Sequence, residues 1–225
     1  MSTPKVKHFP IQPSWPPAAR AMQSCAFILA ANWVFQGMRG MDRKELGFRL
    51  GLEALVAFLI ASVLIAHEIG AEPAAILALL LAHTASFLFN GQLWVCARYC
   101  RAWHRDPATL EAAFLDIVRE LRRQPWLDEA VAIGSRGDRG AVRGDRSDLD
   151  VRIVVPEGIE GLVRANLLLI RLRTEALLGR IPLDIYAYDE PRSLDRFDQR
   201  ERLLVLLDRR GRLERRYPQR VSGQA

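Results

Sequence analysis

Val131-Ala132-Ile133-Gly134-Ser135 is the stretch that decides the fold of this chain, together with Asp148-Leu149-Asp150-Val151-Arg152-Ile153-Val154-Val155, which follows twelve residues later. The first stretch predicts an apolar strand that ends in a tight turn, and the second predicts a strand that begins with two acids. Because side chains alternate along a strand, Asp148 and Asp150 share one face. Two neighbouring carboxylates repel each other unless a cation lies between them. The pattern therefore predicts a Mg²⁺ site beside a phosphate-binding turn.

The segment from 106 to 217 is predicted to be an α/β domain with a small mixed sheet around these two strands. Asp106-Pro107 is a typical helix start and predicts a helix through about Arg122. Later elements are a helix over 159–178 that ends at Gly179, a strand over 181–188, and a final hairpin formed by 203–207 and 213–217. Residues 218–225 are predicted to be a disordered tail.

The predicted strand over 181–188 carries a third acid, Asp184. The motif parts follow a recognisable order along the chain: an apolar residue, Gly-Ser, a spacer, Asp-x-Asp and a later strand with one more Asp. This order resembles the DNA polymerase β-type nucleotidyltransferase superfamily. The resemblance covers roughly 106–217 and rests on Ile133-Gly134-Ser135, Ser147-Asp148-Leu149-Asp150-Val151 and Leu183-Asp184-Ile185.

The resemblance implies a metal-dependent nucleotidyltransferase that moves a nucleoside monophosphate from an NTP to a hydroxyl or phosphate acceptor and releases pyrophosphate. Gly134 and Ser135 would hold the nucleotide phosphates through backbone N–H groups. Asp148 and Asp150 would ligate Mg²⁺ or Mn²⁺ that bridges the triphosphate. Asp184 would be the third metal ligand and would accept the proton of the attacking hydroxyl. Such a transition state is strongly anionic, so cations placed in advance suit the chemistry.

The spacer between the turn and the acids is long and basic. Arg136 lies nearest the phosphate turn and is predicted to contact the nucleotide. The alternative is a solvated loop in which acids and arginines pair locally. RNA binding through Arg and Gly is disfavoured because no aromatic residues are interleaved. The other arginines of the spacer are Arg139, Arg143 and Arg146.

Other interpretations of the acids stay open at this stage. Asp148 and Asp150 could instead lie on a solvated strand edge or pair with neighbouring arginines. Asp189 or Asp195 could replace Asp184 if the strand register differed by one residue, because such a slip turns every side chain to the other face. Tyr186 lies on the Asp184 face, where it could stack on a base or simply pack, and so does Tyr188.

The first hundred residues are apolar and nearly free of acids, which sets them apart from the densely charged remainder. Two apolar runs, 50–69 and 74–97, each approach the ~20 residues that cross a bilayer. The connector 67–73 has no Lys or Arg, whereas both outer flanks are basic. This asymmetry predicts a transmembrane helical hairpin over 49–98 in the cytoplasmic membrane, with the catalytic domain in the cytoplasm. A soluble hairpin buried in a dimer core is the alternative.

Residues 1–48 are predicted to contain a polar segment and then an apolar helix over 21–38. Trp33 and Phe35 suit a helix that lies in the membrane interface, although the segment could equally cap the hairpin. Whether the hairpin spans fully or forms a shallow re-entrant pair stays open, because Glu53 shortens the uncharged part of the first run. His83 and other polar residues inside the hairpin would be easier to satisfy in a homo-oligomer.

The net charge and the cysteine content limit the possible binding partners and the cellular compartment. The net charge of +6 fits phosphate ligands, nucleic acid or an anionic membrane. No nucleic-acid-binding domain is evident, which argues against nucleic acid as a partner. The three cysteines form no disulfide framework and are predicted to be reduced, as in a cytosolic protein. Cys96, Cys100 and His104 have the spacing of one helix face, but one helix rarely encloses a metal.

The acceptor cannot be deduced from the residues. A membrane tether makes a lipid-linked or glycan precursor attractive, and a protein acceptor is the nearest alternative within the same chemistry. Arg164, Arg171 and Arg173 could reach an acceptor pocket or form a solvated face. Two rival classes are a membrane glycosyltransferase, which also uses Asp-x-Asp, and a non-catalytic module that binds a nucleotide or serves as a scaffold.

Overall fold

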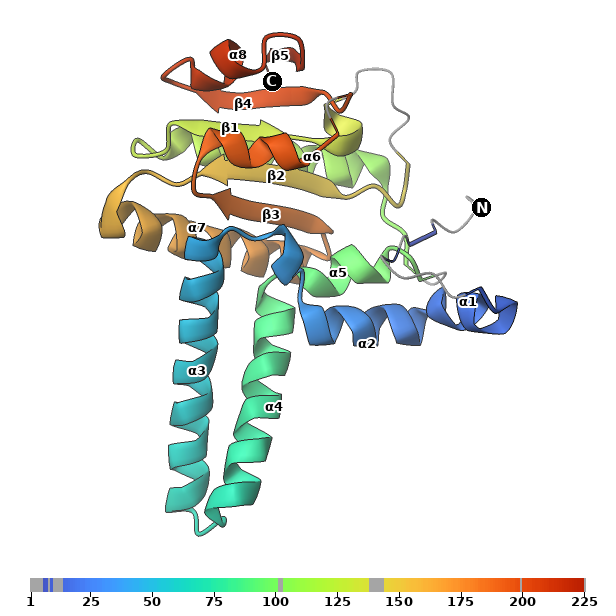
Figure 1. Cartoon of the computed structure of the whole chain (residues 1–225), viewed down its shortest axis with the longest axis vertical. Helices are drawn as coiled ribbons and strands as arrows, with labels where there is room; N and C mark the ends of the chain where they lie inside the picture. Colours follow the sequence, from blue (N-terminus) through green and yellow to red (C-terminus); the bar gives the residue numbers. More distant parts are fainter. Residues whose placement is uncertain are drawn as a thin grey trace.

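A computed structural model describes residues 6–7, 9, 14–100, 103–137, 144–198 and 200–224. A sheet flanked by helices forms one end of the molecule, and a long helical hairpin projects from it (Figure 1). The helices are α1 (Pro16–Met22), α2 (Cys25–Phe35), α3 (Arg43–Ala66), α4 (Ala71–Phe89), α5 (Gln92–Ala97), α6 (Pro107–Arg123), α7 (Gly158–Gly179) and α8 (Arg212–Arg216), with 3₁₀ turns η1 (Met38–Gly40), η2 (Gly134–Arg136) and η3 (Pro191–Arg196). The strands are β1 (Glu129–Ala132), β2 (Leu149–Val154), β3 (Leu183–Tyr188), β4 (Leu203–Asp208) and β5 (Val221–Gln224).

The sheet is small and mixed, as the sequence predicts. Its five strands have the order β3-β2-β1-β4-β5. β1 runs antiparallel to both β2 and β4, whereas β2 is parallel to β3 and β4 is parallel to β5. Parallel neighbours need a long crossover, and α7 supplies it between β2 and β3. The helices predicted over 106–122 and 159–178 are confirmed within one or two residues by α6 and α7.

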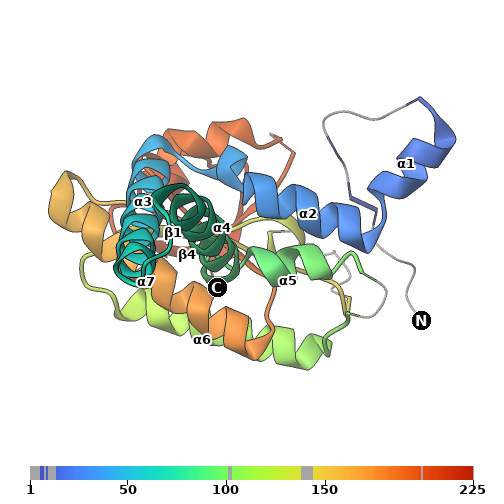
Figure 2. The same ribbon diagram turned by 90° about the horizontal axis from the view of Figure 1, so that it is seen from below.

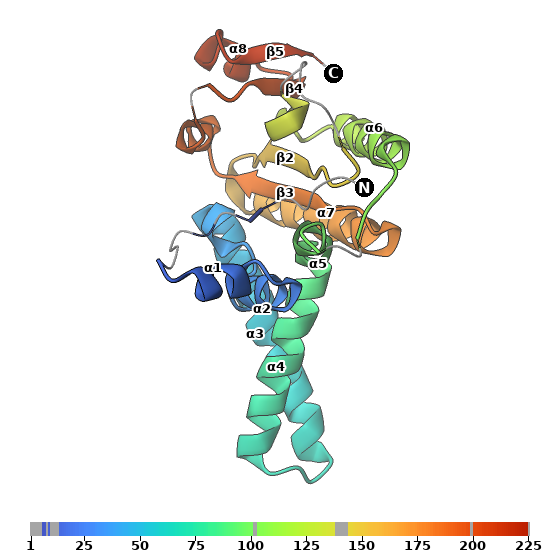
Figure 3. The same ribbon diagram turned by 90° about the vertical axis from the view of Figure 1, so that its right-hand side faces the viewer.

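Alternation along β2 and β3 gives the sheet two different faces. One face is apolar and packs against α6 and α7, as the side view shows (Figure 3). It carries Leu149, Val151 and Ile153 of β2 and the corresponding residues of β3. The other face is rich in polar groups, and residues from η1, the start of α3 and η3 cover part of it. The register keeps every acid predicted for the site off the apolar face.

The hairpin α3–α4 has two helices that are long and apolar enough to cross a membrane, judged by length and composition. Only 11% and 22% of their apolar windows are buried, so they are not core helices of this chain. Figure 2 views the hairpin from below, where α3 and α4 lie side by side. Large apolar side chains remain exposed along both helices, among them Leu55, Phe58, Val63, Ile76 and Leu79.

The second apolar run was predicted to be one helix, but the structure divides it into two. α4 ends at Phe89, and Gly91 has a φ of +74°, a conformation that glycine adopts without strain. The chain then turns into α5, which packs against β3. Because α5 ends at Ala97, the predicted helix face formed by Cys96, Cys100 and His104 does not exist.

α2 lies across the base of the hairpin (Figure 1). The ring of Trp33 packs edge-on against that of His83 on α4, with 4.8 Å between centroids. Phe27, Val34 and Phe35 of the same helix stay exposed. The helix therefore contacts the hairpin base, as one interpretation of 21–38 proposed, and it also presents the apolar surface that the other proposed.

The cysteine prediction is wrong for two of the three residues. Cys25 at the start of α2 and Cys100 after α5 form a disulfide, and Cys96 is free and buried. The bond links α2 to the chain that follows α5. Sequence spacing did not reveal it, because the two cysteines are 75 residues apart.

The C-terminal part also differs from its prediction. Residues 212–216 form α8, not a hairpin strand, because the Asp208 carboxylate accepts hydrogen bonds from the N–H groups of Arg212, Leu213 and Glu214 and so caps the helix start. The expected tail contributes β5, which pairs with β4. β5 extends the sheet on the side away from the α3–α4 hairpin, and α8 lies next to it (Figure 1).

The base of α3 is joined to the outer edge of β3 by buried acids. Glu45 accepts a hydrogen bond of 2.7 Å from the Ala187 N–H and forms an ion pair of 2.6 Å with Arg173 of α7. One turn earlier, Asp42 accepts the Asp189 N–H at 2.9 Å. Because β3 is an edge strand, these acceptors satisfy backbone donors that would otherwise face a buried interface.

Replacing Glu45 by Ala is expected to lower the free energy of unfolding by about 3 kcal/mol. The reason is that Arg173 would stay buried without its carboxylate and the Ala187 N–H would lose its acceptor. Denaturant unfolding of the full chain in detergent measures this. Glu160, which is exposed on α7, is the control, and its replacement by Gln should change stability by less than about 0.5 kcal/mol. Equal effects of the two changes would contradict the role assigned to Glu45.

Candidate functional site: a carboxylate cluster on the polar face of the sheet

Asp148, Asp150 and Asp184, here called the carboxylate cluster, lie near one another on the polar face. Asp150 of β2 and Asp184 of β3 are direct partners in the parallel ladder, so their side chains emerge side by side. Asp148 precedes β2 by one residue and points to the same face by alternation. The side chains are between 12% and 19% exposed.

The pKa values of Asp150 and Asp184 shift in opposite directions. Burial, together with the charges of Asp148 and Asp184, raises the pKa of Asp150 well above its ordinary value. Burial also opposes ionisation of Asp184, but the guanidinium of Arg152 and a hydrogen bond with Asp150 hold the pKa of Asp184 below its ordinary value. Protonation is therefore favoured at Asp150 and ionisation at Asp184. Acids that resist ionising together mark a place where added positive charge would be favourable.

Two arginines neutralise the rest of the cluster. Arg98, which follows α5, forms an ion pair with Asp148. Arg152 of β2 contacts Asp184 at 3.1 Å and lies 4.0 Å from Asp150. Burial lowers the pKa of each arginine, but the nearby acids outweigh it and raise both pKa values, led by Asp148 for Arg98 and by Asp184 for Arg152. The pairing that the sequence left open as an alternative is thus present.

The Gly-Ser turn lies beside the cluster. Gly134 has a φ of +65°, and a Cβ added there would come within 3.1 Å of Asp150 Oδ2. Its N–H donates a 2.8 Å hydrogen bond to Oε1 of Glu201, which precedes β4. The amide of this turn therefore already holds an anionic oxygen, as a phosphate-binding turn would. The described part of the chain brings Gly134 and Ser135 of η2 and the three acids together.

Arg136 is not brought to this cluster. Its side chain turns to the opposite side of the sheet, where it pairs with Glu111 and stacks 4.3 Å above the Phe114 ring of α6. It is 3% exposed, so it serves the packing of α6. Of the other spacer arginines, Arg139 and Arg143 lie outside the described residues. Arg146 donates hydrogen bonds to the carbonyls of Arg98 and Cys100.

The alternative third acids lie elsewhere. Asp195 of η3 pairs with Arg216 at 2.5 Å and is roughly half exposed. The N–H of Asp189 is bound by Asp42 at the hairpin base. Arg173 is buried against Glu45, and Arg164 pairs with Glu160 at the surface of α7. Register and contacts therefore favour Asp184 as the acid that joins Asp150.

Further groups at the rim come from the N-terminal half. Lys7 donates a 2.8 Å hydrogen bond to Asn32, and burial lowers its pKa while Cys96 and Asp184 act in the opposite direction. Its ammonium lies 5.3 Å from the centre of the Tyr99 ring. Burial raises the pKa of Cys96 to about 12, so this thiol is not a nucleophile.

Sequence reasoning missed Arg152, Arg98, Lys7 and Glu201. Arg152 has the same parity along the strand as the acids, and this signal could have placed it. Nothing local marks Arg98 or Lys7, because tertiary packing brings them from the apolar half of the chain. Within the described residues, no three side chains of His, Cys, Asp or Glu form a group that could hold a metal ion. Arg98 engages Asp148, whereas Asp150 and Asp184 are partners in the ladder of β2 and β3.

Comparison of the chain with models of protein families, with curated proteins and with solved structures gives no match in any of the three.

Replacing Asp150 by Asn is expected to flatten the dependence of stability on pH in the absence of metal. The pKa of Asp150 is raised on folding, so the folded state binds its proton more tightly than the unfolded chain does. Stability from this proton is complete below the ordinary value of 3.8 and is lost as pH rises through the folded pKa. Unfolding in EDTA between about pH 4 and pH 8 measures the slope. A slope that is the same in wild type and Asp150→Asn would contradict the raised pKa of Asp150.

Proposed function

We propose that this chain is a metal-dependent nucleotidyltransferase that transfers a nucleoside monophosphate from an NTP to a hydroxyl or phosphate acceptor. The observation that carries the proposal is the side-by-side placement of Asp150 and Asp184 on neighbouring parallel strands, next to the positive-φ turn at Gly134. Acids at this spacing with a phosphate-binding amide beside them suit transfer of a phosphoryl group.

The order of elements supports the same proposal. A helix leads to β1, β1 ends in the Gly-Ser turn, and β2 returns antiparallel with its two acids. The crossover helix α7 then delivers β3, which adds Asp184 in parallel. The motif residues of the DNA polymerase β-type superfamily, which this chain resembles, are expected on elements in this order. The topology therefore agrees with the motif at each step, although the motif alone suggested the family.

The donor set fits a hard divalent cation such as Mg²⁺ or Mn²⁺. Carboxylate oxygens are the ligands that these ions prefer, and the raised pKa of Asp150, caused by burial and the charges of Asp148 and Asp184, is what a bound cation would reverse. Asp150 and Asp184 would hold the ion, and Asp148 would join them after leaving Arg98. The bound ion would supply charge neutralisation for the triphosphate and the transition state.

The remaining groups would bind the triphosphate and handle the proton. The Gly134 N–H would exchange the Glu201 carboxylate for a phosphate oxygen, since both are anionic acceptors. Arg98, released from Asp148, and Lys7 would add positive charge at the same rim. Asp184, which is ionised, would accept the proton of the attacking hydroxyl.

We also propose that the α3–α4 hairpin anchors the catalytic domain to a membrane. Its length and exposed apolar surface support this, and α2 would lie in the interface. The basic flanks favour an orientation with the catalytic domain in the cytoplasm, where NTPs are abundant. A membrane tether favours an acceptor that is itself lipid-linked, for example a glycan precursor.

A non-catalytic nucleotide-binding module is the second candidate. The ion pairs of Arg98 with Asp148 and of Arg152 with Asp184 favour it, because they balance most of the cluster without a metal. A glycosyltransferase has no such observation in its favour. The two candidates differ in whether pyrophosphate is released.

Asp150→Asn and Asp184→Asn are each expected to abolish Mg²⁺-dependent release of pyrophosphate, by about a thousandfold or more, because each removes a charge that would hold the ion. The measurement is turnover of all four NTPs labelled at the α-phosphate, in native membranes that contain the acceptor. Membrane association of both variants should be unchanged.

The matched control is Asp195→Asn, which changes the same residue type on the same domain but outside the cluster. It should keep at least about half of the wild-type rate. Full activity in Asp150→Asn would overturn the site. Nucleotide binding without any pyrophosphate release in the wild type would favour the non-catalytic module.

The orientation of the hairpin in the membrane needs a separate test, because two observations about it disagree. The basic flanks favour a cytoplasmic side for Cys25 and Cys100, whereas a disulfide between them is typical of an oxidising compartment. With a cytoplasmic domain, both thiols are expected to be reduced in living cells and to react with a maleimide after denaturation. Rapid acid quenching followed by gel-shift alkylation measures this. A bond that resists labelling in freshly quenched cells would reverse the proposed orientation.

A further inference from the structure

A cavity of about 190 Å³ lies between α3, α4 and α7, at the point where the hairpin leaves the sheet. Apolar side chains such as Phe48, Val56 and Ala85 line part of it. Leu52 and Phe89, which are 40% and 48% exposed, border it and continue into the apolar surface of the hairpin. Figure 2 shows α3, α4 and α7 meeting in this region. The cavity is separate from the carboxylate cluster.

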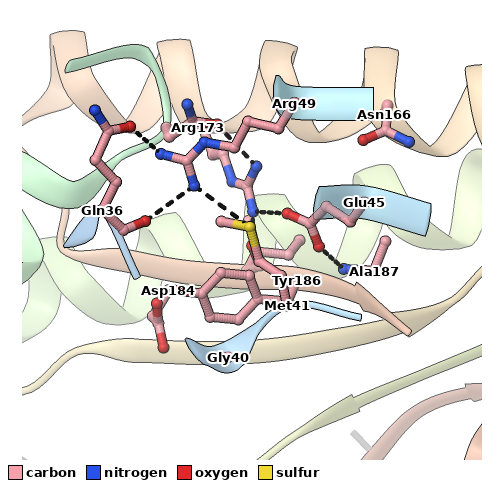
Figure 4. Close-up of polar contacts among 12 residues, drawn as sticks. Gln36, Gly40, Met41, Glu45, Arg49, Asn166, Arg173, Asp184, Tyr186 and Ala187 are labelled. Atoms are coloured by element: carbon pink, nitrogen blue, oxygen red, sulfur yellow. Dashed lines mark hydrogen bonds and ion pairs between the residues drawn. The ribbon is translucent and has the colours of Figure 1, made fainter. Parts of the chain in front are cut away.

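Arg49 brings a positive charge to the cavity and forms no ion pair within the described part of the chain. Its guanidinium donates to the Gln36 carbonyl at 2.9 Å, to the Gln36 side chain at 2.6 Å and toward Met41 sulfur (Figure 4), all of which are neutral. Its Nε is buried and has no hydrogen-bond partner in the described part of the chain. Arg49 is only 5% exposed. A buried guanidinium with an unused donor needs an anion.

The other charged groups that line the cavity have charged or ring partners. Glu45 and Arg173 form an ion pair (Figure 4). Oε1 of Glu53 lies 2.7 Å from Nδ1 of His83, and Oε2 of Glu53 is buried without a hydrogen-bond partner among the described residues. Arg49 is therefore the cation of the lining that has a free donor and no ion pair within the described residues.

The depth of Arg49 along the hairpin identifies the source of the anion. Residues 50–66 rise roughly 25 Å along α3, close to the ~30 Å of a bilayer core. With the polar connector at one membrane surface, Arg49 lies near the other surface, at the level of lipid phosphates. The exposed basic residues Arg43 and Lys44 lie one to two turns before it.

We propose that this cavity binds the phosphodiester headgroup of an anionic phospholipid, with Arg49 as its charge partner. The volume corresponds to roughly six water molecules, enough for a phosphodiester and a few attached carbons but not for acyl chains. The chains would leave past Leu52 and Phe89 along the hairpin. This site rests on the proposed membrane insertion and not on the proposed enzymatic activity.

The test compares lipid binding by the full chain in neutral detergent, using native mass spectrometry with phosphatidylglycerol, phosphatidylcholine and water-soluble glycerol phosphate as probes. Phosphatidylglycerol should bind most tightly. Arg49→Gln should weaken it about tenfold, because a charge-assisted contact is lost, whereas Arg43→Gln on the exposed first turn should change it less than about twofold. Ala85→Phe, which fills the cavity and leaves Arg49 in place, should also weaken binding about tenfold.

Several results would overturn the site. Unchanged phosphatidylglycerol binding in Arg49→Gln would remove the charge partner. Should that variant fail to fold, unchanged binding in Ala85→Phe would remove the cavity. Equal binding of phosphatidylcholine would contradict the charge argument, and equal binding of glycerol phosphate would contradict the lipid. Pyrophosphate release plays no part in this readout, so failure here is distinguishable from failure of the proposed enzyme.

Discussion

The buried contact of Glu45 with Arg173 and the edge of β3 is the constraint on which the arrangement depends. An edge strand with unpaired N–H groups can be buried only where acceptors meet it, and the first two turns of α3 provide them through Asp42 and Glu45. The same contact fixes the hairpin to α7. This one contact therefore sets the direction of α3. It also sets the position of the cavity beside Arg49 and of the loop that packs on Tyr186.

The charges on the polar face follow a second constraint, which is that buried acids need positive partners. Arg98 and Arg152 supply two, and the pKa of Asp150 is raised where such a partner is lacking. The proposed chemistry depends on this balance, because a divalent cation bound there would favour ionisation of Asp150 and would compete with Arg98 for Asp148.

Sequence patterns predicted much of the sheet, but few of the contacts that the N-terminal half makes with its polar face. Alternation placed Asp148 and Asp150 on one face because period-2 patterning is local, and the resemblance added Asp184, which the structure pairs with Asp150. Arg98 and the bond between Cys25 and Cys100 depend on contacts across 50 or more residues, which no local pattern records. Arg136 was placed near the phosphate turn by proximity in sequence, but a short 3₁₀ turn rotates it toward α6. The break at Gly91 was hidden inside a continuous apolar run.

The fit of Gly37 and Gly40 over Tyr186 limits which residues the loop before α3 can contain. A Cβ at Gly37 would lie 2.4 Å from the Tyr186 hydroxyl, and one at Gly40 would lie 3.0 Å from its ring. The loop before α3 thus follows the shape of a side chain that lies two residues from Asp184. The sheet without the N-terminal half would expose that tyrosine and the edge of β3 beside it. Side-chain size is therefore restricted by direct contact at this loop, next to the carboxylate cluster.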